Sequence, residues 1–158
     1  MSYAYSNRYQ SNEALKDVSC SFEHGLIYAI IGKSGSGKST ALSLMAGLDV
    51  PDKGDVLFQG QSTRTMDLER FRRDEVAMIY QSYRLFPLLT AVENVMYPME
   101  LHQVKPREAR KRAEAYIKSV DLSEDTFQRF PSMLSGGEQQ RVAIARALAM
   151  DTKNYSRG

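Results

Sequence analysis

The sequence has 158 residues, of which 42% are apolar, and a single cysteine, Cys20. A chain of this size can bury one substantial hydrophobic core, so we expect one globular domain. Its 21 basic and 19 acidic residues give a net charge of +2, which does not indicate a nucleic-acid-binding protein. No apolar run approaches the roughly 20 residues that span a bilayer, and one cysteine agrees with a reducing, cytoplasmic setting.

The first half of the chain predicts a strand, a glycine-rich loop and a helix, in that order. Residues 26–31 form a short apolar run typical of a buried parallel strand, and residues 39–46 have the pattern of a helix that ends at Gly47. Between them the sequence matches G-x-x-x-x-G-K-[ST], in which backbone N–H groups surround nucleotide phosphates, the lysine neutralises their charge and the hydroxyl group holds Mg²⁺. The predicted nucleotide-binding residues are Gly32, Lys33, Ser34, Gly35, Ser36, Gly37, Lys38, Ser39 and Thr40.

The segment after this P-loop unit predicts turns, short strands and one helix. Residues 51–54 are typical of a turn before a strand at residues 55–58, and residues 66–74 are charged and have helical periodicity. Residues 76–80 predict a second buried strand, which places Gln81 at its end. The sequence therefore indicates an α/β domain with a parallel core sheet and an antiparallel β patch.

A helical subdomain is predicted for residues 82–133. Thr90 is a good N-cap with Glu93 at the capping-box position, and Pro106 fits the first turn of another helix. The basic cluster at residues 105–112 contains an interleaved glutamate, so we interpret it as the solvated face of a helix and expect no nucleic-acid partner.

A second glycine motif, Leu-Ser-Gly-Gly-Glu-Gln-Gln-Arg, occupies residues 134–141. Its small residues open a helix predicted at residues 138–150, so N–H groups and the positive end of the helix dipole face outward. This arrangement predicts a second anion site, formed by Ser135, Gly136, Gly137 and Glu138.

With the P-loop, Gln81 and this octapeptide in that order, the chain resembles the nucleotide-binding subunits of ABC transporters over residues 3–153. Residues 79–87 and 89–95 look closest to the branch that serves macrolide exporters, lipoprotein-releasing complexes and antimicrobial-peptide resistance transporters. The resemblance implies an ABC-type P-loop NTPase fold that is incomplete at its C-terminus. Its parts would be the P-loop core and β patch (1–81), the helical subdomain (82–133), the signature motif and helix (134–150) and an aberrant tail (154–158).

The resemblance also implies roles for individual residues. Lys38 would contact the β- and γ-phosphates of ATP, Ser39 would ligate Mg²⁺, and Gln81 would reach both the metal and the attacking water, so that Lys38 and Gln81 form the catalytic set. An aromatic residue near the first strand would stack on adenine. Tyr5 is the first choice for this role and Tyr9 the second, and the alternative is that Tyr5 packs on a neighbouring strand.

In the resembling family the octapeptide faces the γ-phosphate bound by the other subunit, so ATP joins a head-to-tail homodimer. A membrane permease would be the second partner, which implies a cytoplasmic protein peripheral to the inner face of the cell membrane. The apolar cluster formed by Tyr83, Leu85, Phe86, Leu88 and Leu89 could receive a permease helix or fill the helical subdomain core.

The end of the sequence departs from the family. After Lys153 an apolar strand ending in Asp-Glu is expected, whereas residues 154–158 read Asn-Tyr-Ser-Arg-Gly. We therefore expect this chain to lack the catalytic glutamate and a later histidine, to bind ATP at best, and to expose apolar surface along residues 26–31 and 76–80. One inserted adenine would generate this ending and a stop codon, and a deliberate truncation is the alternative. For function, the alternatives are an inactive remnant or a soluble ABC-type ATPase without a membrane partner.

Overall fold

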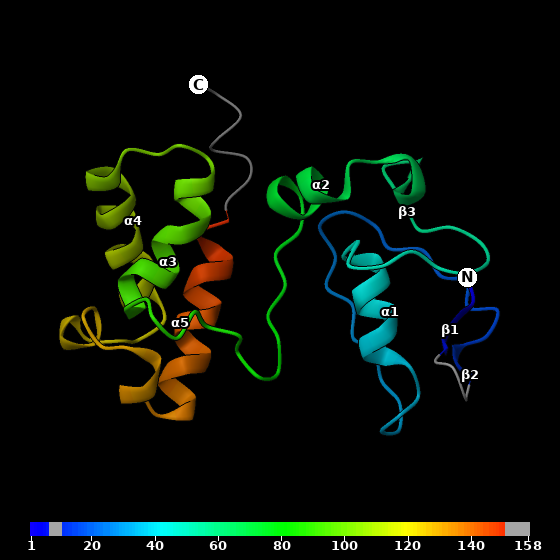
Figure 1. The fold of residues 1–158 in the computed structure, drawn as a ribbon, viewed down its shortest axis with the longest axis horizontal. Helices are drawn as coiled ribbons and strands as arrows, with labels where there is room; N and C mark the ends of the chain where they lie inside the picture. The colour runs from blue at the N-terminus through cyan, green and yellow to red at the C-terminus, as the bar shows by residue number, and fades with distance from the viewer. Residues whose placement is uncertain (7–10, 151–158) are drawn as a thin grey trace. The chain divides into compact units, whose positions relative to one another are not determined.

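The computed structural model describes residues 1–6 and 11–150. The chain divides into two compact units, Met1–Arg72 and Arg73–Gly158, whose elements are labelled in Figure 1. The described part of the first unit consists of short antiparallel hairpins, helices and connecting loops. Its elements are β1 (Tyr3–Ser6), β2 (Ser11–Leu15), α1 (Lys38–Met45), β3 (Leu57–Phe58), β4 (Gln61–Ser62), the 3₁₀ turn Thr63–Thr65 and α2 (Leu68–Asp74), which runs into the second unit.

The predicted antiparallel β patch is present in the first unit. β1 pairs with β2, so that Tyr3 lies opposite Leu15. β3 pairs with β4 through a turn at Gln59 and Gly60, whose φ angles of 50° and 82° are those of a two-residue hairpin turn that matches the sheet twist. In the described residues these are two separate two-stranded ladders.

The predicted parallel core sheet is not formed by the described residues. Residues 26–31 and 76–80 were expected to be its strands, but neither segment belongs to a ladder. The physical reason is that a strand satisfies its backbone N–H and C=O groups only through a neighbouring strand, and the described chain gives these segments none. The expected exposure of apolar side chains is confirmed for Ile27 and Ile31, which are 101% and 92% exposed.

The two helices of the first unit match their predictions closely. α1 begins at Lys38 and its last residue is Met45, after which Gly47 has a φ of +64°. α2 lies within the predicted range 66–74, and the Asp67 carboxylate caps it by accepting hydrogen bonds from the N–H groups of Glu69 and Arg70 at 3.0 and 3.1 Å.

The second unit is helical, as predicted. Its elements are α3 (Ala91–Leu101), α4 (Pro106–Ser119), the 3₁₀ turns Glu124–Thr126 and Pro131–Met133, and α5 (Gly136–Leu148). Figure 1 shows α3, α4 and α5 side by side, and all three pairs of helices are in contact. Their shared core contains, among others, Val92, Val95, Met99, Ala113, Ile117, Val142 and Ala145, all of which are completely or almost completely buried.

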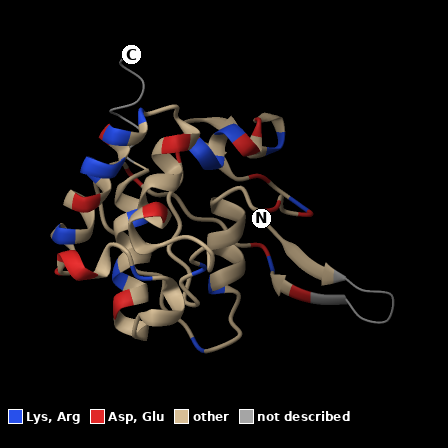
Figure 2. Ribbon diagram, turned by 60° about the vertical axis from the view of Figure 1, so that its left-hand side comes forward, with Lys and Arg blue, Asp and Glu red and all other residues tan. Residues whose placement is uncertain are grey.

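The starts of α3 and α4 were read correctly from the sequence. Thr90 and Glu93 form a full capping box at α3, and Pro106 is the first residue of α4. Along α4, Arg110 pairs with Glu114, and Arg112 pairs with Glu108. Basic and acidic positions are interspersed along the helices in Figure 2, which agrees with the interpretation of residues 105–112 as a solvated face.

A buried amide holds the segment before α3. Asn94 is 0% exposed, and its Oδ1 accepts the N–H of Phe86 at 2.8 Å. Its Nδ2 donates to the carbonyl oxygens of Phe86, Leu89 and Thr90 at 3.1, 2.9 and 3.0 Å. The loop of residues 86–90 is therefore fixed to α3. Within the described residues, no helix combines the length and apolar character that a bilayer crossing requires.

Candidate functional site

The P-loop turns tightly into the start of α1. The Ser36 N–H donates to the Lys33 carbonyl at 3.2 Å, and Gly37 precedes the helix in the left-handed conformation, with φ of 84°. The Ala41 N–H donates to the Gly37 carbonyl at 2.8 Å, which is the first full helical hydrogen bond. The N–H groups of the first turn have no helical acceptor and lie at the positive end of the helix dipole, so this loop is suited to an anion.

The side-chain ammonium group of Lys38 is hydrogen-bonded to the backbone of this loop. Its Nζ donates to the carbonyl oxygens of Gly32 and Lys33, both at 2.7 Å, and approaches the Ser36 Oγ at 3.4 Å. An ammonium group has three donors. Two strong hydrogen bonds anchor the Lys38 side chain over the loop, and the third donor has only the long contact to Ser36, so it is the one best placed to bind a phosphate oxygen.

One P-loop glycine is required by a close contact with the backbone. A Cβ on Gly37 would lie 2.4 Å from the Ala14 carbonyl oxygen, whereas a Cβ on Gly32 would lie 2.7 Å from the Ser36 Oγ, which can rotate away. Ala14 belongs to β2, so the end of the P-loop packs directly on this hairpin. Gly35 differs, because it has a φ of +78° but nothing within 4 Å of the added Cβ.

Tyr5, the predicted adenine-stacking residue, stands beside the first turn of α1. Its hydroxyl group lies 3.3 Å from the Thr40 Oγ1, and its ring meets the edge of Tyr3 at a centroid distance of 5.1 Å. The Tyr5 side chain is 54% exposed, so one part of the ring packs on a neighbour and another part is open. Tyr9, the second choice, lies outside the described residues.

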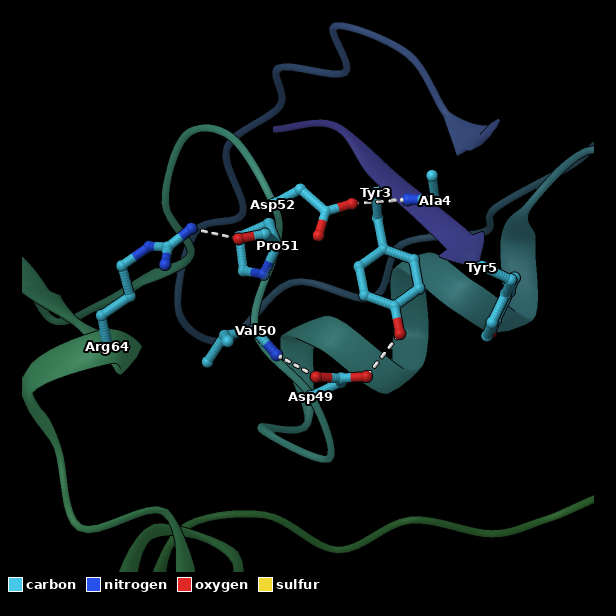
Figure 3. A pocket seen from close by; sticks show the side chains of 8 residues that line it. All are labelled: Tyr3, Ala4, Tyr5, Asp49, Val50, Pro51, Asp52 and Arg64. Atoms are coloured by element: carbon cyan, nitrogen blue, oxygen red, sulfur yellow. Dashed lines mark hydrogen bonds between the residues drawn. The ribbon is translucent and has the colours of Figure 1, made fainter. Parts of the chain in front are cut away.

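A pocket of about 490 Å³ is lined in part by Tyr3 and Tyr5 (Figure 3). Its walls come from β1, from the loop of residues 49–52 and from Arg64. The Tyr3 hydroxyl donates to Asp49, and this hydrogen bond raises the pKa of Tyr3 to about 12. The Ala4 N–H donates to Asp52 at 2.7 Å. Two carboxylates line this pocket, which makes it unsuited to phosphate.

The second glycine motif forms the N-terminus of α5, two residues before the predicted helix start. Ser135 is the N-cap, and its Oγ accepts the Glu138 N–H at 3.3 Å. The Glu138 carboxylate in return accepts the Ser135 N–H and hydroxyl group, both at 2.7 Å, and these hydrogen bonds lower the pKa of Glu138. The capping box therefore joins Ser135 to Glu138, and Gly136 and Gly137 between them are exposed. That these four residues bind an anion stays a prediction.

Gln81 lies in a turn of the second unit that follows residues 76–80, and its side chain is exposed. The Tyr83 N–H donates to the Tyr80 carbonyl at 3.0 Å, and Tyr83 and Arg84 are left-handed, with φ of 58° and 46°. The position of Gln81 follows from this turn and not from the end of a strand, which corrects the sequence-based expectation.

Two contacts at this turn were missed from the sequence. A Cβ on Gly136 would lie 3.5 Å from the Tyr83 hydroxyl, so the turn reaches the start of α5. Arg146 of α5 donates to the carbonyl oxygens of Arg84 and Tyr83, and burial lowers its pKa. The sequence could have drawn attention to Arg146 because it is a charged residue between two alanines, Ala145 and Ala147, in a predicted helix.

The apolar cluster after Gln81 is divided between the helical core and the surface. Leu85 packs against the core of the second unit, whereas Leu88 is 86% exposed and Phe86 and Pro87 are also exposed. Part of the cluster therefore fills the helical core and part presents apolar surface.

The donor atoms of the P-loop fit a magnesium ion only as a companion of phosphate. In the described part of the chain, no group of three or more His, Cys, Asp or Glu side chains is arranged to hold a metal. Ser39 supplies one exposed hydroxyl group at the first turn of α1. Mg²⁺ commonly takes one or two protein ligands, substrate phosphates and water, so Ser39 is a suitable partial ligand.

Comparison with known proteins decides the family. A model of the ABC transporter family matches residues 15–155, which include the P-loop, Gln81 and the signature octapeptide. The chain belongs to the ABC transporter family. Among its ABC transporter relatives, the uncharacterised ATP-binding protein YclH of Bacillus subtilis is 38% identical over 150 residues, which cover 95% of this chain and 66% of YclH. The uncharacterised ATP-binding protein MJ1508 of Methanocaldococcus jannaschii is 46% identical over 143 residues, which cover 89% of this chain and 63% of MJ1508.

A solved ABC structure agrees on the fold. The dimeric structure of the ATP-binding cassette MJ0796 in a post-hydrolysis state, bound to ADP and Pi, matches with a TM-score of 0.89 at 40% identity. The match covers 95% of this chain and 67% of MJ0796. These findings confirm the predicted ABC-type P-loop NTPase fold, and the chain spans about three fifths to two thirds of the length of its relatives.

Proposed function

We propose that this chain is the ATP-binding part of an ABC transporter subunit that couples ATP binding and hydrolysis to transport through a membrane permease. The observation that carries the proposal is the P-loop of an ABC family member, in which Lys38 is anchored by two carbonyls at the N-terminus of α1. The same site supports ATP as the ligand, because anion-binding N–H groups and a fixed ammonium group converge on one loop.

Each residue of the loop has a proposed task. The backbone N–H groups of residues 34–37 bind phosphate oxygens, for which the Ser36 N–H gives up its hydrogen bond to the Lys33 carbonyl. Lys38 neutralises the β- and γ-phosphates, and Ser39 ligates Mg²⁺. The metal supplies neutralisation of phosphate charge when it is bound. Tyr5 is proposed to stack on adenine, which its exposed ring and its place beside the first turn of α1 support. Gln81 is proposed to orient the attacking water and to complete the metal site.

The proposed assembly is a homodimer with two shared nucleotide sites. In it, the N–H groups of Gly136 and Gly137 at the start of α5 bind the γ-phosphate held by the partner's P-loop. The dimeric structure of MJ0796 supports this arrangement for a related cassette. The capping box uses the N–H groups of Ser135 and Glu138 and neither of these two N–H groups, which supports their availability to an anion.

The permease is proposed to dock on the apolar surface of Phe86, Pro87 and Leu88, which places the subunit on the inner face of the cell membrane. The exposure of Leu88 supports this surface. We also propose the exporter-like branch named above, supported by residues 79–87 and 89–95. One relative is a probable sulfate/thiosulfate import ATP-binding protein of Chlorella vulgaris, 40% identical over 148 residues, so the direction of transport remains part of the proposal.

The first experiment measures ATP binding by the 158-residue chain with a fluorescent ATP analogue and Mg²⁺. Lys38→Ala is expected to weaken binding by about tenfold or more, since it removes a charge-assisted contact worth at least ~1.4 kcal/mol. Lys53→Ala is the matched control, because Lys53 is an exposed lysine of the same unit outside the P-loop, and its hydrogen bonds to Ser2 use its backbone. Equal binding by Lys38→Ala and the wild type would contradict the proposal.

The same samples separate the alternatives. Turnover of ATP by the 158-residue chain would exclude the inactive remnant, whereas ATP binding alone would not, because a remnant that keeps the P-loop can still bind the nucleotide. Co-purification of the intact subunit with a permease supports the transporter, whereas its absence with retained ATP turnover supports a soluble ABC-type ATPase.

A further inference from the structure

Arg146 joins helix α5 to the turn that carries Gln81. Its Nη1 donates to the Arg84 carbonyl at 2.8 Å and its Nη2 donates to the Tyr83 carbonyl at 3.1 Å, across 62 and 63 residues of sequence. The guanidinium also lies 5.7 Å from the ring centroid of Phe86. A planar group with two parallel donors can bind two successive carbonyls at once, which a lysine ammonium does not do with the same geometry.

The two carbonyls belong to a backbone conformation that needs support. Tyr83 and Arg84 both have positive φ, of 58° and 46°, although neither is glycine, asparagine or aspartate. The chain between them and Gln81 is short and tightly folded, since the Arg84 N–H donates to the Ser82 carbonyl at 2.6 Å. Such conformations persist where the surroundings hold them, and they are common at functional sites. The two hydrogen bonds from Arg146 are placed to hold this one.

Two further contacts hold the chain around this turn, one from α3 to Phe86 and one between Tyr83 and the start of α5. Asn94 of α3 binds the backbone of Phe86 through two hydrogen bonds, of 2.8 and 3.1 Å. The Tyr83 hydroxyl lies next to Gly136, at the N-terminus of α5, about three turns before Arg146. One helix, α5, therefore contacts the turn at the signature motif and again at Arg146.

We propose that Arg146 is a positioning residue, which locks the turn of residues 80–84 to α5 so that Gln81 moves with the signature motif. Gln81 lies two residues before Tyr83, whose carbonyl Arg146 binds. A displacement of the start of α5, such as one imposed by an anion or a second subunit at Gly136, is thereby passed to the Gln81 side chain. The effect on ATP turnover rests on the proposed function. The attachment of the turn to α5 by Arg146, called the lock below, does not depend on that function.

Hydrogen exchange of the full chain tests the lock without any activity. Arg146→Met is expected to raise the exchange rate of the Tyr83 and Arg84 amides by about tenfold or more, and Arg146→Lys by less, because lysine keeps the charge but not the paired donors. Exchange within α3 and α4 should stay as in the wild type. Arg110→Met, which removes a surface ion pair of α4, is the matched control. If Arg146→Met fails to fold, Arg146→Lys decides alone. Wild-type exchange at Tyr83 and Arg84 in Arg146→Lys and in any folded Arg146→Met would overturn the proposal.

Kinetics of the intact subunit test the route through Gln81. Arg146→Lys is expected to lower kcat for ATP with little change in KM, and to lower it no further in a Gln81→Ala background. Additive losses in the double variant would overturn the coupling, because they would show that Arg146 acts elsewhere. A wild type that neither binds nor hydrolyses ATP would refute the proposed function, and the exchange result would still decide the lock.

Discussion

Gly37 sets the tightest packing requirement of the P-loop. Its replacement by alanine would bring a Cβ to 2.4 Å from the Ala14 carbonyl oxygen and 2.8 Å from Leu15, in a backbone with φ of 84°. We expect Gly37→Ala to lower the free energy of unfolding by about 2 to 4 kcal/mol, from the left-handed penalty together with overpacking. Urea unfolding followed by circular dichroism measures this change.

Gly35→Ala is the control for this prediction. Gly35 has nearly the same φ, +78°, but its added Cβ would meet nothing within 4 Å. Gly35→Ala should therefore lower the free energy of unfolding only by the cost of the left-handed backbone conformation, about 1 to 2 kcal/mol. Equal losses in the two variants would show that backbone conformation, and not the contact with β2, explains the glycine at position 37.

Which site residues could be predicted depends on how local their chemistry is. Lys38, Ser39 and Ser135 were found because a P-loop and a helix N-terminus are encoded by neighbouring residues. Arg146 and Asn94 were missed because their hydrogen bonds join backbone carbonyls that are distant along the chain or lie in a loop without a motif. The left-handed Tyr83 and Arg84 carry no glycine or asparagine signal, so the turn at Gln81 could not be read from the sequence.

At the scale of elements, the capping box of α3 should make stability depend on pH. Hydrogen bonds from the Thr90 hydroxyl group and N–H lower the pKa of Glu93 below 4.5 in the folded state. A lowered folded pKa gives stability that is present above pH 4.5 and is lost as the pH falls through the folded value. We therefore expect Glu93→Gln, which keeps the cap geometry, to be less stable than the wild type by about 1 kcal/mol at pH 6 and to approach it by pH 3.

Denaturant unfolding at several pH values measures the difference in free energy of unfolding between the wild type and Glu93→Gln. The other carboxylates titrate in both proteins, so their contribution cancels in this difference. Glu100→Gln near the end of the same helix is the matched control, because its position is outside the cap. A wild-type minus Glu93→Gln difference that stays constant from pH 6 to pH 3 would contradict the role of the charged carboxylate in the cap.

Helices were predictable from the sequence and the core strands were not, for a physical reason. A helix satisfies its backbone within one segment, so the cap at Thr90 and the proline at position 106 were enough to place α3 and α4. A strand also needs a neighbour. The apolar runs 26–31 and 76–80 have strand composition, but in the described chain no other segment pairs with either of them. The short hairpins β1–β2 and β3–β4 do form, because each contains its own partner.

At the scale of the whole molecule, the chain combines a well-packed helical unit with a unit that exposes apolar side chains. The second unit has a continuous core among α3, α4 and α5. The first unit has large exposed apolar residues along residues 26–31, including Leu26, Ile27 and Ile31. Exposed apolar runs of this kind promote association, so we expect the chain to self-associate as its concentration rises.

Charge substitution at these positions tests this expectation. The double substitution Ile27→Lys and Ile31→Lys should raise solubility and shift the chain toward monomer, while changing the free energy of unfolding by less than about 0.5 kcal/mol, because both side chains are almost fully exposed. Leu44→Lys is the contrasting control, since Leu44 on α1 is 1% exposed and a charge there should destabilise by several kcal/mol. Sedimentation and urea unfolding measure the two effects. A large loss of stability in the double variant would mean that residues 26–31 are buried in solution, as in the parallel strand first predicted from the sequence.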